Sequence, residues 1–164
     1  MSQREEKIAI VPGSFDPITY GHLDLIERAS KEYDTVYVAV MINAAKHYMF
    51  TLDQRRLIAE AAVRPIPNAR VISSEGMLWK LAKDLGAAAI VKGYRNETDL
   101  AYEKQMAEFN DAHNPDAKTI LLESKSDLLG VSSTVVREKI LRKEGLSDLM
   151  PPEAEALAYQ FIQN

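Results

Sequence analysis

Glycine, serine and histidine residues near the amino terminus have the types and spacing needed to bind a phosphate group. Gly13 and Ser14 follow a short apolar run, and Gly21 and His22 lie at or near the first turn of an expected helix. Glycine lets the chain turn tightly and approach a ligand, while the free N–H groups at a helix start favour anions. His22 could then donate a hydrogen bond to phosphate. The alternative is a capped turn with a solvent-exposed histidine.

A second group of polar residues lies at the start of a later expected helix. Three consecutive hydroxyl residues, at positions 132–134, follow Gly130 and Val131, and Arg137 lies three residues beyond them. Hydroxyl side chains at this point can cap the helix or bind phosphate, and the spacing places Arg137 near the same face. Serine runs are mostly helix caps, so these residues alone leave both interpretations open.

Basic side chains follow two of the expected strands. Lys46 lies in the loop after the second strand, and residues 92–95, Lys-Gly-Tyr-Arg, leave the fourth. If the strands are parallel, these charges meet Ser14 and His22 at the same edge of the sheet. Two lysines, an arginine, a histidine and two helix starts would suit a polyphosphate. Elsewhere in a chain such cations are usually solvated surface charges.

Short apolar runs alternate with amphipathic segments, and this alternation predicts the elements that position these side chains. The apolar runs predict strands at residues 8–12, 35–42, 69–73, 88–92 and 119–123. The amphipathic segments predict helices at residues 23–33, 51–63, 77–85, 98–113, 132–143 and 152–162. We therefore expect an α/β protein with a Rossmann-like five-stranded parallel sheet, helices on both faces and a C-terminal helix.

Local signals support several of these boundaries. Thr51 and Gln54 have the spacing of a capping box, and Gly86 stands where the third helix should end. Residues 124–131 are expected to form a loop. The carboxyl ends of parallel strands are where ligands bind in open sheets, so the polar residues above are expected to converge there.

Composition excludes several classes of protein. The chain has 164 residues, no cysteine and a net charge of −4, so disulfide frameworks, thiolate metal sites and cysteine nucleophiles are excluded. The acidic balance argues against nucleic-acid binding through an overall positive field. No apolar stretch approaches the roughly 18 residues of a membrane span, and the amino terminus lacks the pattern of a signal peptide. We therefore expect a cytoplasmic protein with no membrane partner.

Two of the segments above resemble the signatures of the nucleotidyltransferase superfamily. Residues 13–22, which end in Thr-Tyr-Gly-His, resemble its (H/T)-x-G-H signature. Residues 132–137, Ser-Ser-Thr-Val-Val-Arg, resemble its I-S-S-T-x-x-R signature, with Val131 for the leading isoleucine. The two matches lie about 110 residues apart and at the expected helix starts, so their joint occurrence is specific. The likeness covers essentially the whole chain and predicts a single nucleotidyltransferase domain over residues 1–164.

Within the superfamily, the chain looks most like bacterial phosphopantetheine adenylyltransferases. Lys46 with residues 49–52, residues 92–95 and residues 99–103 carry this resemblance, and the total length agrees. The family transfers AMP from ATP to 4′-phosphopantetheine, giving dephospho-coenzyme A and pyrophosphate in coenzyme A biosynthesis. The resemblance further implies Mg²⁺ held mainly by the ATP phosphates with no dedicated protein ligand, a homohexamer, and feedback binding of coenzyme A.

The resemblance also implies roles for individual residues. His22 and Lys46 match the catalytic positions, and Lys92 stands where the family usually has arginine. The substrate-binding positions implied for phosphopantetheine are Ser14, Lys46, Leu78 and Lys92. Those implied for ATP are Ser14, Phe15, His22, Gly93, Tyr94, Arg95, Glu103, Leu128, Leu129, Gly130, Val131, Ser132, Ser133 and Thr134.

Other interpretations remain open. A nicotinate-mononucleotide adenylyltransferase or a cytidylyltransferase would share both signatures, and a nucleotide-binding module without turnover or a flavodoxin-like binder is a more distant alternative. We expect Asp16 to form a turn, Tyr102 to pack away from Glu103, and Trp79 to pack in the core or an interface. His47 and His113 are expected to be surface residues. The apolar faces around Trp79 and on the C-terminal helix are candidate interfaces between copies.

Overall fold

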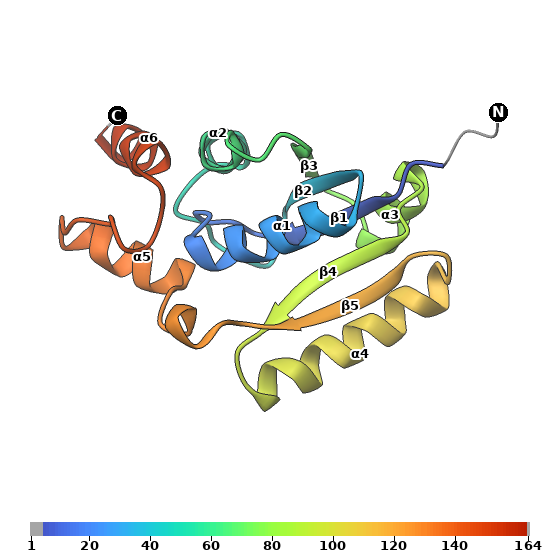
Figure 1. Cartoon of the computed structure of the whole chain (residues 1–164). Coiled ribbons are helices and arrows are strands. Elements are labelled where there is room, and N and C mark those ends of the chain that lie inside the picture. The colour runs from blue at the N-terminus through green and yellow to red at the C-terminus, as the bar shows by residue number, and fades with distance from the viewer. Residues whose placement is uncertain (1–4, 164) are drawn as a thin grey trace.

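The sheet contains five parallel strands in the order β3-β2-β1-β4-β5 (Figure 1). This computed structural model describes residues 5–163. The strand bounds are β1 Ile8–Gly13, β2 Thr35–Met41, β3 Ala69–Ser74, β4 Ala89–Tyr94 and β5 Lys118–Glu123. All five predicted strands are confirmed to within two residues, and the expected parallel arrangement is confirmed with them.

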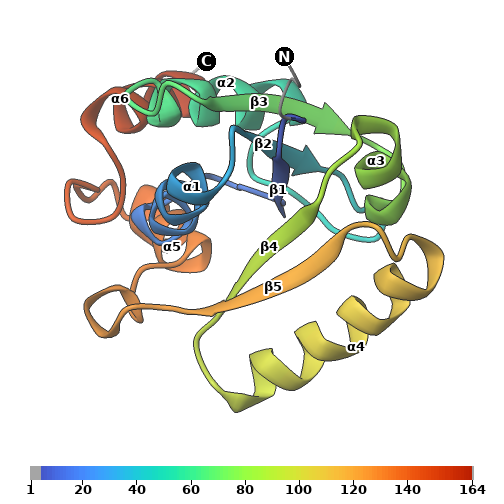
Figure 2. The ribbon, with the colours of Figure 1, turned by 45° about the vertical axis from the view of Figure 1, so that its right-hand side comes forward.

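Helices cover both faces of this sheet, as Figure 2 shows. Helices α1 and α2 lie on one face with α5 and α6 beyond them, and α3 and α4 lie on the other. Their bounds are α1 Tyr20–Glu32, α2 Leu52–Val63, α3 Leu78–Leu85, α4 Glu97–His113, α5 Ser133–Leu141 and α6 Pro152–Gln163. The expected loop at 124–131 contains a short 3₁₀ helix, η1, at Ser126–Leu128. No helix of residues 5–163 is long and apolar enough to cross a membrane.

The core divides into two parts because successive strand residues point to opposite faces of the sheet. Ala9 and Val11 of β1 pack with the α1 and α2 side, whereas Ile10 between them packs with α3. All three are essentially inaccessible to solvent. Burial of a Val or Ile side chain contributes about 1.5–3 kcal/mol, so the continuous apolar runs fix the central strands between two layers of helices.

Two helix ends form as their sequence signals predict. At the start of α2, Thr51 Oγ1 accepts from the Gln54 N–H at 3.1 Å and Gln54 Oε1 accepts from the Thr51 N–H at 3.0 Å. At the end of α3, Gly86 adopts a left-handed conformation with φ of 66°, which glycine adopts without a Cβ penalty. The helix α1, in contrast, begins at Tyr20 rather than at Leu23.

The sheet opens between β1 and β4 at its carboxyl edge. These strands pair only at Ala9 with Ala89 and Ile10 with Ile90, although each continues for three or four more residues. The strand order also reverses here, since the chain crosses from β3 at one edge to β4 on the other side of β1. Ligands of open α/β sheets bind at such a point, so a ligand is expected next to the loops that follow β1 and β4.

Candidate active site

His22 is held at the start of α1 by a capping box. Its Nδ1 accepts the backbone N–H of Thr19 at 3.0 Å, and Thr19 Oγ1 accepts from the Gly21 N–H at 3.2 Å. Because Nδ1 accepts, the neutral ring carries its proton on Nε2. The Nε2–H has no hydrogen-bond partner among residues 5–163 and is available to a ligand. The segment therefore forms a capped turn, and this cap still leaves His22 able to bind a ligand.

The environment of His22 keeps its imidazole neutral. Burial and, as the smaller cause, the positive charge of Arg95 together lower the pKa of His22 from 6.5 to about 4. The ring packs edge-on against Phe15, with ring centroids 4.8 Å apart. Phe15 has a φ of 49°, unusual for a bulky residue, and its ring lies 3.1 Å from the position a Gly13 Cβ would take. Gly13 thus makes room for the aromatic ring that supports His22.

Asp16 joins the loop after β1 to the loop after β2. Its buried carboxylate accepts the backbone N–H of Met49 at 2.9 Å and that of Phe50 at 3.0 Å. Its carbonyl oxygen accepts from the Arg137 guanidinium at 2.8 Å. Asp16 therefore connects three segments of the candidate site, which is a wider structural role than the turn expected from its sequence.

The hydroxyl residues at the start of α5 bind mainly to the protein itself. Ser132 caps the helix by accepting the Val135 N–H at 3.2 Å, and Ser133 Oγ donates to the Pro17 carbonyl at 2.8 Å. Arg137 donates to Thr134 Oγ1 at 3.1 Å, as the helical spacing predicted. A Cβ on Gly21 would lie 3.3 Å from the Val131 carbonyl oxygen, so the starts of α1 and α5 lie close together. The loop 128–131 before α5 borders them.

The basic residues differ in how closely they pair with acidic side chains. Lys92 forms an ion pair with Glu103 of α4, with Nζ and Oε2 2.8 Å apart and both side chains mostly buried. Arg95 contacts Asp99 more loosely, with 3.4 Å between Nε and Oδ2, and it is about half exposed. Lys46 is exposed and forms no ion pair among residues 5–163. A phosphate meeting Lys92 would therefore share its ammonium group with Glu103.

Residues 10–139 match the family described as Cytidylyltransferase-like. The chain belongs to this family of the nucleotidyltransferase superfamily. The match covers both signature segments, and it confirms the superfamily resemblance drawn from residues 13–22 and 132–137. Nucleotidyl transfer is thus the reaction class to which this cytidylyltransferase-like site belongs.

A structural neighbour supports the same fold. A Vibrio parahaemolyticus protein, provisionally described as a nicotinate-nucleotide adenylyltransferase, superposes with a TM-score of 0.73 and 19% sequence identity. The similarity covers 93% of this chain and 91% of the neighbour. At this identity the comparison establishes a shared architecture, and the acceptor specificity within the family is a separate question.

Several residues implied by the resemblance lie at the edges of this cluster. Leu78, at the first turn of α3, packs its side chain on the apolar cluster of Ile10, which leaves its backbone as the available contact. Tyr94 is the last residue of β4 and pairs with Glu123 of β5. Leu129 is exposed. No sequence pattern pointed to Arg55, which is fully buried and donates to the Ser14 carbonyl at 2.7 Å.

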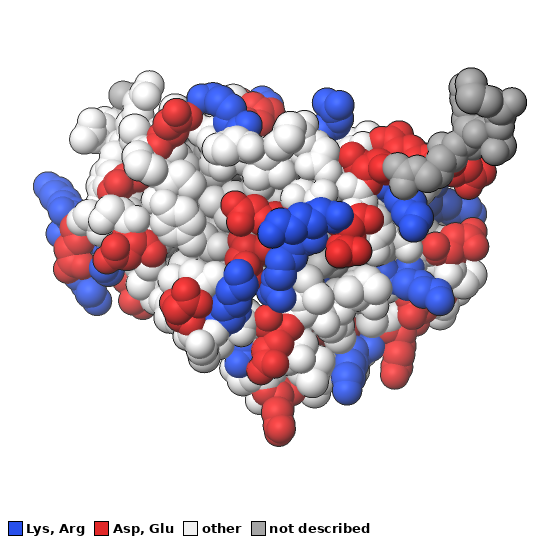
Figure 3. All heavy atoms as spheres, viewed as in Figure 1, with Lys and Arg blue, Asp and Glu red and all other residues white. Residues whose placement is uncertain are grey.

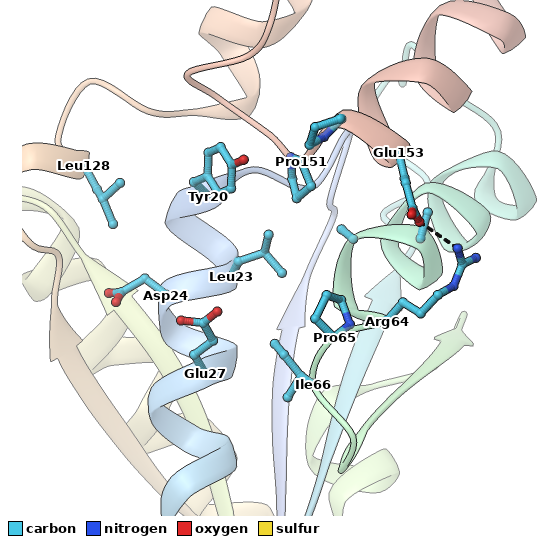
Figure 4. Close-up of a pocket in the computed structure, with 13 residues that line it drawn as sticks. Tyr20, Leu23, Asp24, Glu27, Arg64, Pro65, Ile66, Leu128, Pro151 and Glu153 are labelled. Atoms are coloured by element: carbon cyan, nitrogen blue, oxygen red, sulfur yellow. Dashed lines mark hydrogen bonds and ion pairs between the residues drawn. The ribbon is translucent and has the colours of Figure 1, made fainter.

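A separate hollow of about 690 Å³ lies between α1, the end of α2 and the start of α6 (Figure 4). Its walls are mainly apolar, and Arg64 on its rim is paired with Glu153 at 2.6 Å. It contains none of the basic side chains considered for phosphate binding. Its chemistry does not suit a triphosphate, although helix α1 borders both this hollow and the candidate site.

Lys and Arg side chains are interspersed with Asp and Glu on the face drawn in Figure 3. Within residues 5–163 no group of three or more His, Asp or Glu side chains is arranged to hold a metal ion. Both carboxylate oxygens of Asp16 accept backbone N–H groups, so this carboxylate serves to hold two loops together.

Proposed function

We propose that this protein transfers AMP from ATP to 4′-phosphopantetheine, giving dephospho-coenzyme A and pyrophosphate. The observation that carries the proposal is a neutral His22 with an available Nε2–H at the start of α1, next to the carboxyl ends of β1 and β4, where these two strands no longer pair. The Lys46 and Lys92-to-Arg95 pattern, which resembles phosphopantetheine adenylyltransferases, supports this acceptor. Within the family, this pattern of basic residues is not the one expected of a nicotinate-mononucleotide adenylyltransferase.

The proposed reaction is an in-line displacement at the α-phosphorus of ATP. A phosphate oxygen of phosphopantetheine forms the new P–O bond, and the bond from the α-phosphorus to the bridging oxygen breaks, releasing pyrophosphate. The attacking oxygen is already ionised at neutral pH, so no general base is required. Catalysis then depends on positioning and on donors directed at the developing charge.

His22 would supply such a donor without adding a formal charge. Its Nε2–H would donate to an α-phosphate oxygen, while the Thr19 N–H fixes the ring orientation through Nδ1. A bound triphosphate would raise the pKa of His22 from its value in the free protein, because a nearby negative charge favours the imidazolium. Lys46 would bridge the acceptor phosphate and the α-phosphate as a mobile cation.

Lys92 would define the acceptor side of the site, and it is paired with Glu103, which the resemblance assigns to ATP. The phosphate of phosphopantetheine would approach the Lys92 ammonium, which Glu103 already holds near the end of β4. Mg²⁺, when bound with ATP, would neutralise part of the triphosphate charge, and its ligands would be phosphate oxygens and water. Coenzyme A carries both a phosphopantetheine arm and an adenine nucleotide, so it would occupy both halves of the site as an inhibitor.

Nicotinate mononucleotide is the second candidate acceptor. The Vibrio parahaemolyticus neighbour favours it through its provisional description, and the chemistry is the same attack of an acceptor phosphate on ATP. Cytidylyl transfer, which the family description favours, would replace ATP with CTP.

Product identification tests the proposal. The protein is incubated with ATP, Mg²⁺ and phosphopantetheine, and the products are measured by mass spectrometry. We expect dephospho-coenzyme A and pyrophosphate in equal amounts, and no adenylylated product from pantetheine, which lacks the phosphate. Absence of dephospho-coenzyme A, with product from nicotinate mononucleotide or CTP, would replace the proposed function with the corresponding alternative.

A further inference from the structure

Arg55 of α2 joins the carboxyl ends of two neighbouring strands. Its side chain is fully buried, and one terminal nitrogen donates to the Ser14 carbonyl at 2.7 Å and to the Met41 carbonyl at 3.0 Å. Ser14 comes directly after β1, and Met41 is the last residue of β2. A single guanidinium therefore links the exits of both strands.

The same guanidinium also supports the loop that carries Lys46. It lies over the Tyr48 ring, 3.9 Å from the ring centroid, and the Tyr48 hydroxyl accepts the backbone N–H of Asn43 at 2.8 Å. The Lys46 N–H in turn donates to the Asn43 carbonyl at 2.9 Å. Residues 43–48 thus form a closed loop that rests on Arg55, while its Lys46 side chain stays exposed.

We propose that Arg55 is a positioning residue that fixes Lys46 relative to the loop bearing Ser14 and His22. The inference rests on the proposed function, in which these groups act on the same phosphates. Misplacement of a reacting group by about 1 Å can cost roughly 10²-fold in rate. Arg55 touches no substrate in this account, and it acts through the two loops that it connects.

Arginine suits this position better than lysine. Its planar guanidinium can donate within its plane to two carbonyl oxygens while its face stacks on an aromatic ring. A lysine ammonium could keep one or two hydrogen bonds but would lose the stacking on Tyr48. Asp16 holds the far end of the same loop through Met49 and Phe50, so loss of Arg55 should loosen residues 43–48 without releasing the whole segment.

The test compares variants that separate positioning from stability. Arg55→Met removes the donors and keeps much of the length, and Arg55→Lys restores a cation. Tyr48→Leu removes only the stacking ring and its hydroxyl, and it serves if Arg55→Met does not fold. Ile58→Ala, at a fully buried position of the same helix, is the matched control for stability. Arg56→Met is the control for charge, because among residues 5–163 Arg56 pairs only with Asp53 and Glu60, on the surface of α2.

Four quantities are measured for each variant: kcat, amide hydrogen exchange, trypsin cleavage and Tm. We expect Arg55→Met and Tyr48→Leu to lower kcat for dephospho-coenzyme A formation about 10–100-fold, with partial recovery in Arg55→Lys. Both should also speed amide hydrogen exchange in residues 43–48 and trypsin cleavage after Lys46. Ile58→Ala should lower Tm at least as much as Arg55→Met but keep kcat within about 3-fold, and Arg56→Met should leave kcat and loop exchange unchanged.

Unchanged exchange and cleavage in both Arg55→Met and Tyr48→Leu would overturn the inference. So would a fall in kcat for Ile58→Ala that matches the fall for Arg55→Met. The exchange and cleavage measurements need no substrate. If the parent protein forms no dephospho-coenzyme A, the proposed function fails, while the loop measurements still decide whether Arg55 holds the Lys46 loop.

Discussion

An ordinary histidine is half protonated near pH 6.5, whereas His22 has a pKa of about 4 because it is buried near the positive charge of Arg95. At pH 7 it is a neutral donor with Nε2–H available. A donor that strengthens its bond as charge develops acts mainly on the transition state. We therefore expect His22 to contribute more to the reaction rate than any other single side chain.

His22→Ala should lower kcat about 10²–10³-fold, the usual cost of removing one donor to a developing negative charge. The dissociation constant for ATP should change much less, because the ground-state triphosphate has other contacts. Steady-state kinetics and calorimetric ATP titration measure the two effects. A kcat within a few-fold of the parent protein would remove His22 from the catalytic role.

The low pKa of His22 also predicts a loss of stability in mild acid. The unfolded chain binds a proton at His22 below about pH 6.5, while the folded protein resists protonation until about pH 4. The free energy of unfolding is therefore unaffected by His22 above pH 6.5, where the ring is neutral in both states. It falls as the pH drops from 6.5 toward 4. From pH 7 to pH 5 this amounts to about 2 kcal/mol of unfolding free energy. Urea unfolding measures this effect: the free energy of unfolding should depend less steeply on pH in His22→Gln than in the parent protein.

Lys92 tests the acceptor side of the site. Lys92→Ala should raise the KM for phosphopantetheine while ATP affinity stays nearly unchanged, and Lys92→Arg should be tolerated because the charge and reach remain. Glu103 would be left as an unpaired, mostly buried carboxylate in Lys92→Ala, so Lys92→Ala with Glu103→Gln separates this penalty from the phosphate contact. An unaltered KM in both alanine variants would make Arg95 the better phosphate ligand.

At the scale of elements, the order and type of the strands and helices follow from the sequence because apolar periodicity repeats over whole segments. The start of α1 at Tyr20 could not be read from that periodicity, since the Thr19–His22 capping box extends the helix beyond its apolar stripe. The Lys92–Glu103 ion pair and the burial of Arg55 depend on contacts between distant elements. In a single sequence Arg55 resembles an ordinary surface charge, and nothing indicates that Lys92 pairs with Glu103.

Gly93 controls how closely α1 approaches β4. A Cβ at Gly93 would lie 2.8 Å from Leu25 Cδ1 of α1, so Gly93→Ala should force the half-buried Leu25 side chain to move and cost about 1 kcal/mol of stability. The same substitution should be less costly in a Leu25→Ala background. A double-mutant cycle by chemical denaturation measures this coupling, and purely additive effects would contradict the contact.

At the scale of the whole molecule, exposed apolar side chains indicate where copies of the chain could meet. Tyr102, Met106 and Phe109 follow one another along α4 and are exposed, as is Ile120 of the edge strand β5. Tyr102 was expected to pack away from Glu103, and its exposure shows that it is not packed within the described chain. Trp79 stacks on His113 beside this surface. The face of α6 that carries Ala154 and Ala158 is buried within the chain, so it is not the free surface that its sequence predicted.

We propose that the α4 surface forms the contact of the expected homo-oligomer. Phe109→Asp places a charge within this apolar stripe and should lower the assembly mass in light-scattering measurements. Leu141→Asp, at an exposed apolar residue of α5, is the matched control and should leave the mass unchanged. A parent protein that is monomeric at micromolar concentration would contradict the expected hexamer, and an unchanged mass in Phe109→Asp would exclude this surface.

The choice of acceptor is the central claim, and the ratio of two specificity constants tests it most directly. The same preparation is assayed with ATP and Mg²⁺ against phosphopantetheine and against nicotinate mononucleotide, and kcat/KM is measured for each. We predict a preference for phosphopantetheine of at least about 10³-fold, because contacts to the parts in which the two acceptors differ, outside the shared phosphate, lower the transition-state free energy of one reaction only and so appear in kcat/KM. Equal constants, or a preference for nicotinate mononucleotide, would contradict it.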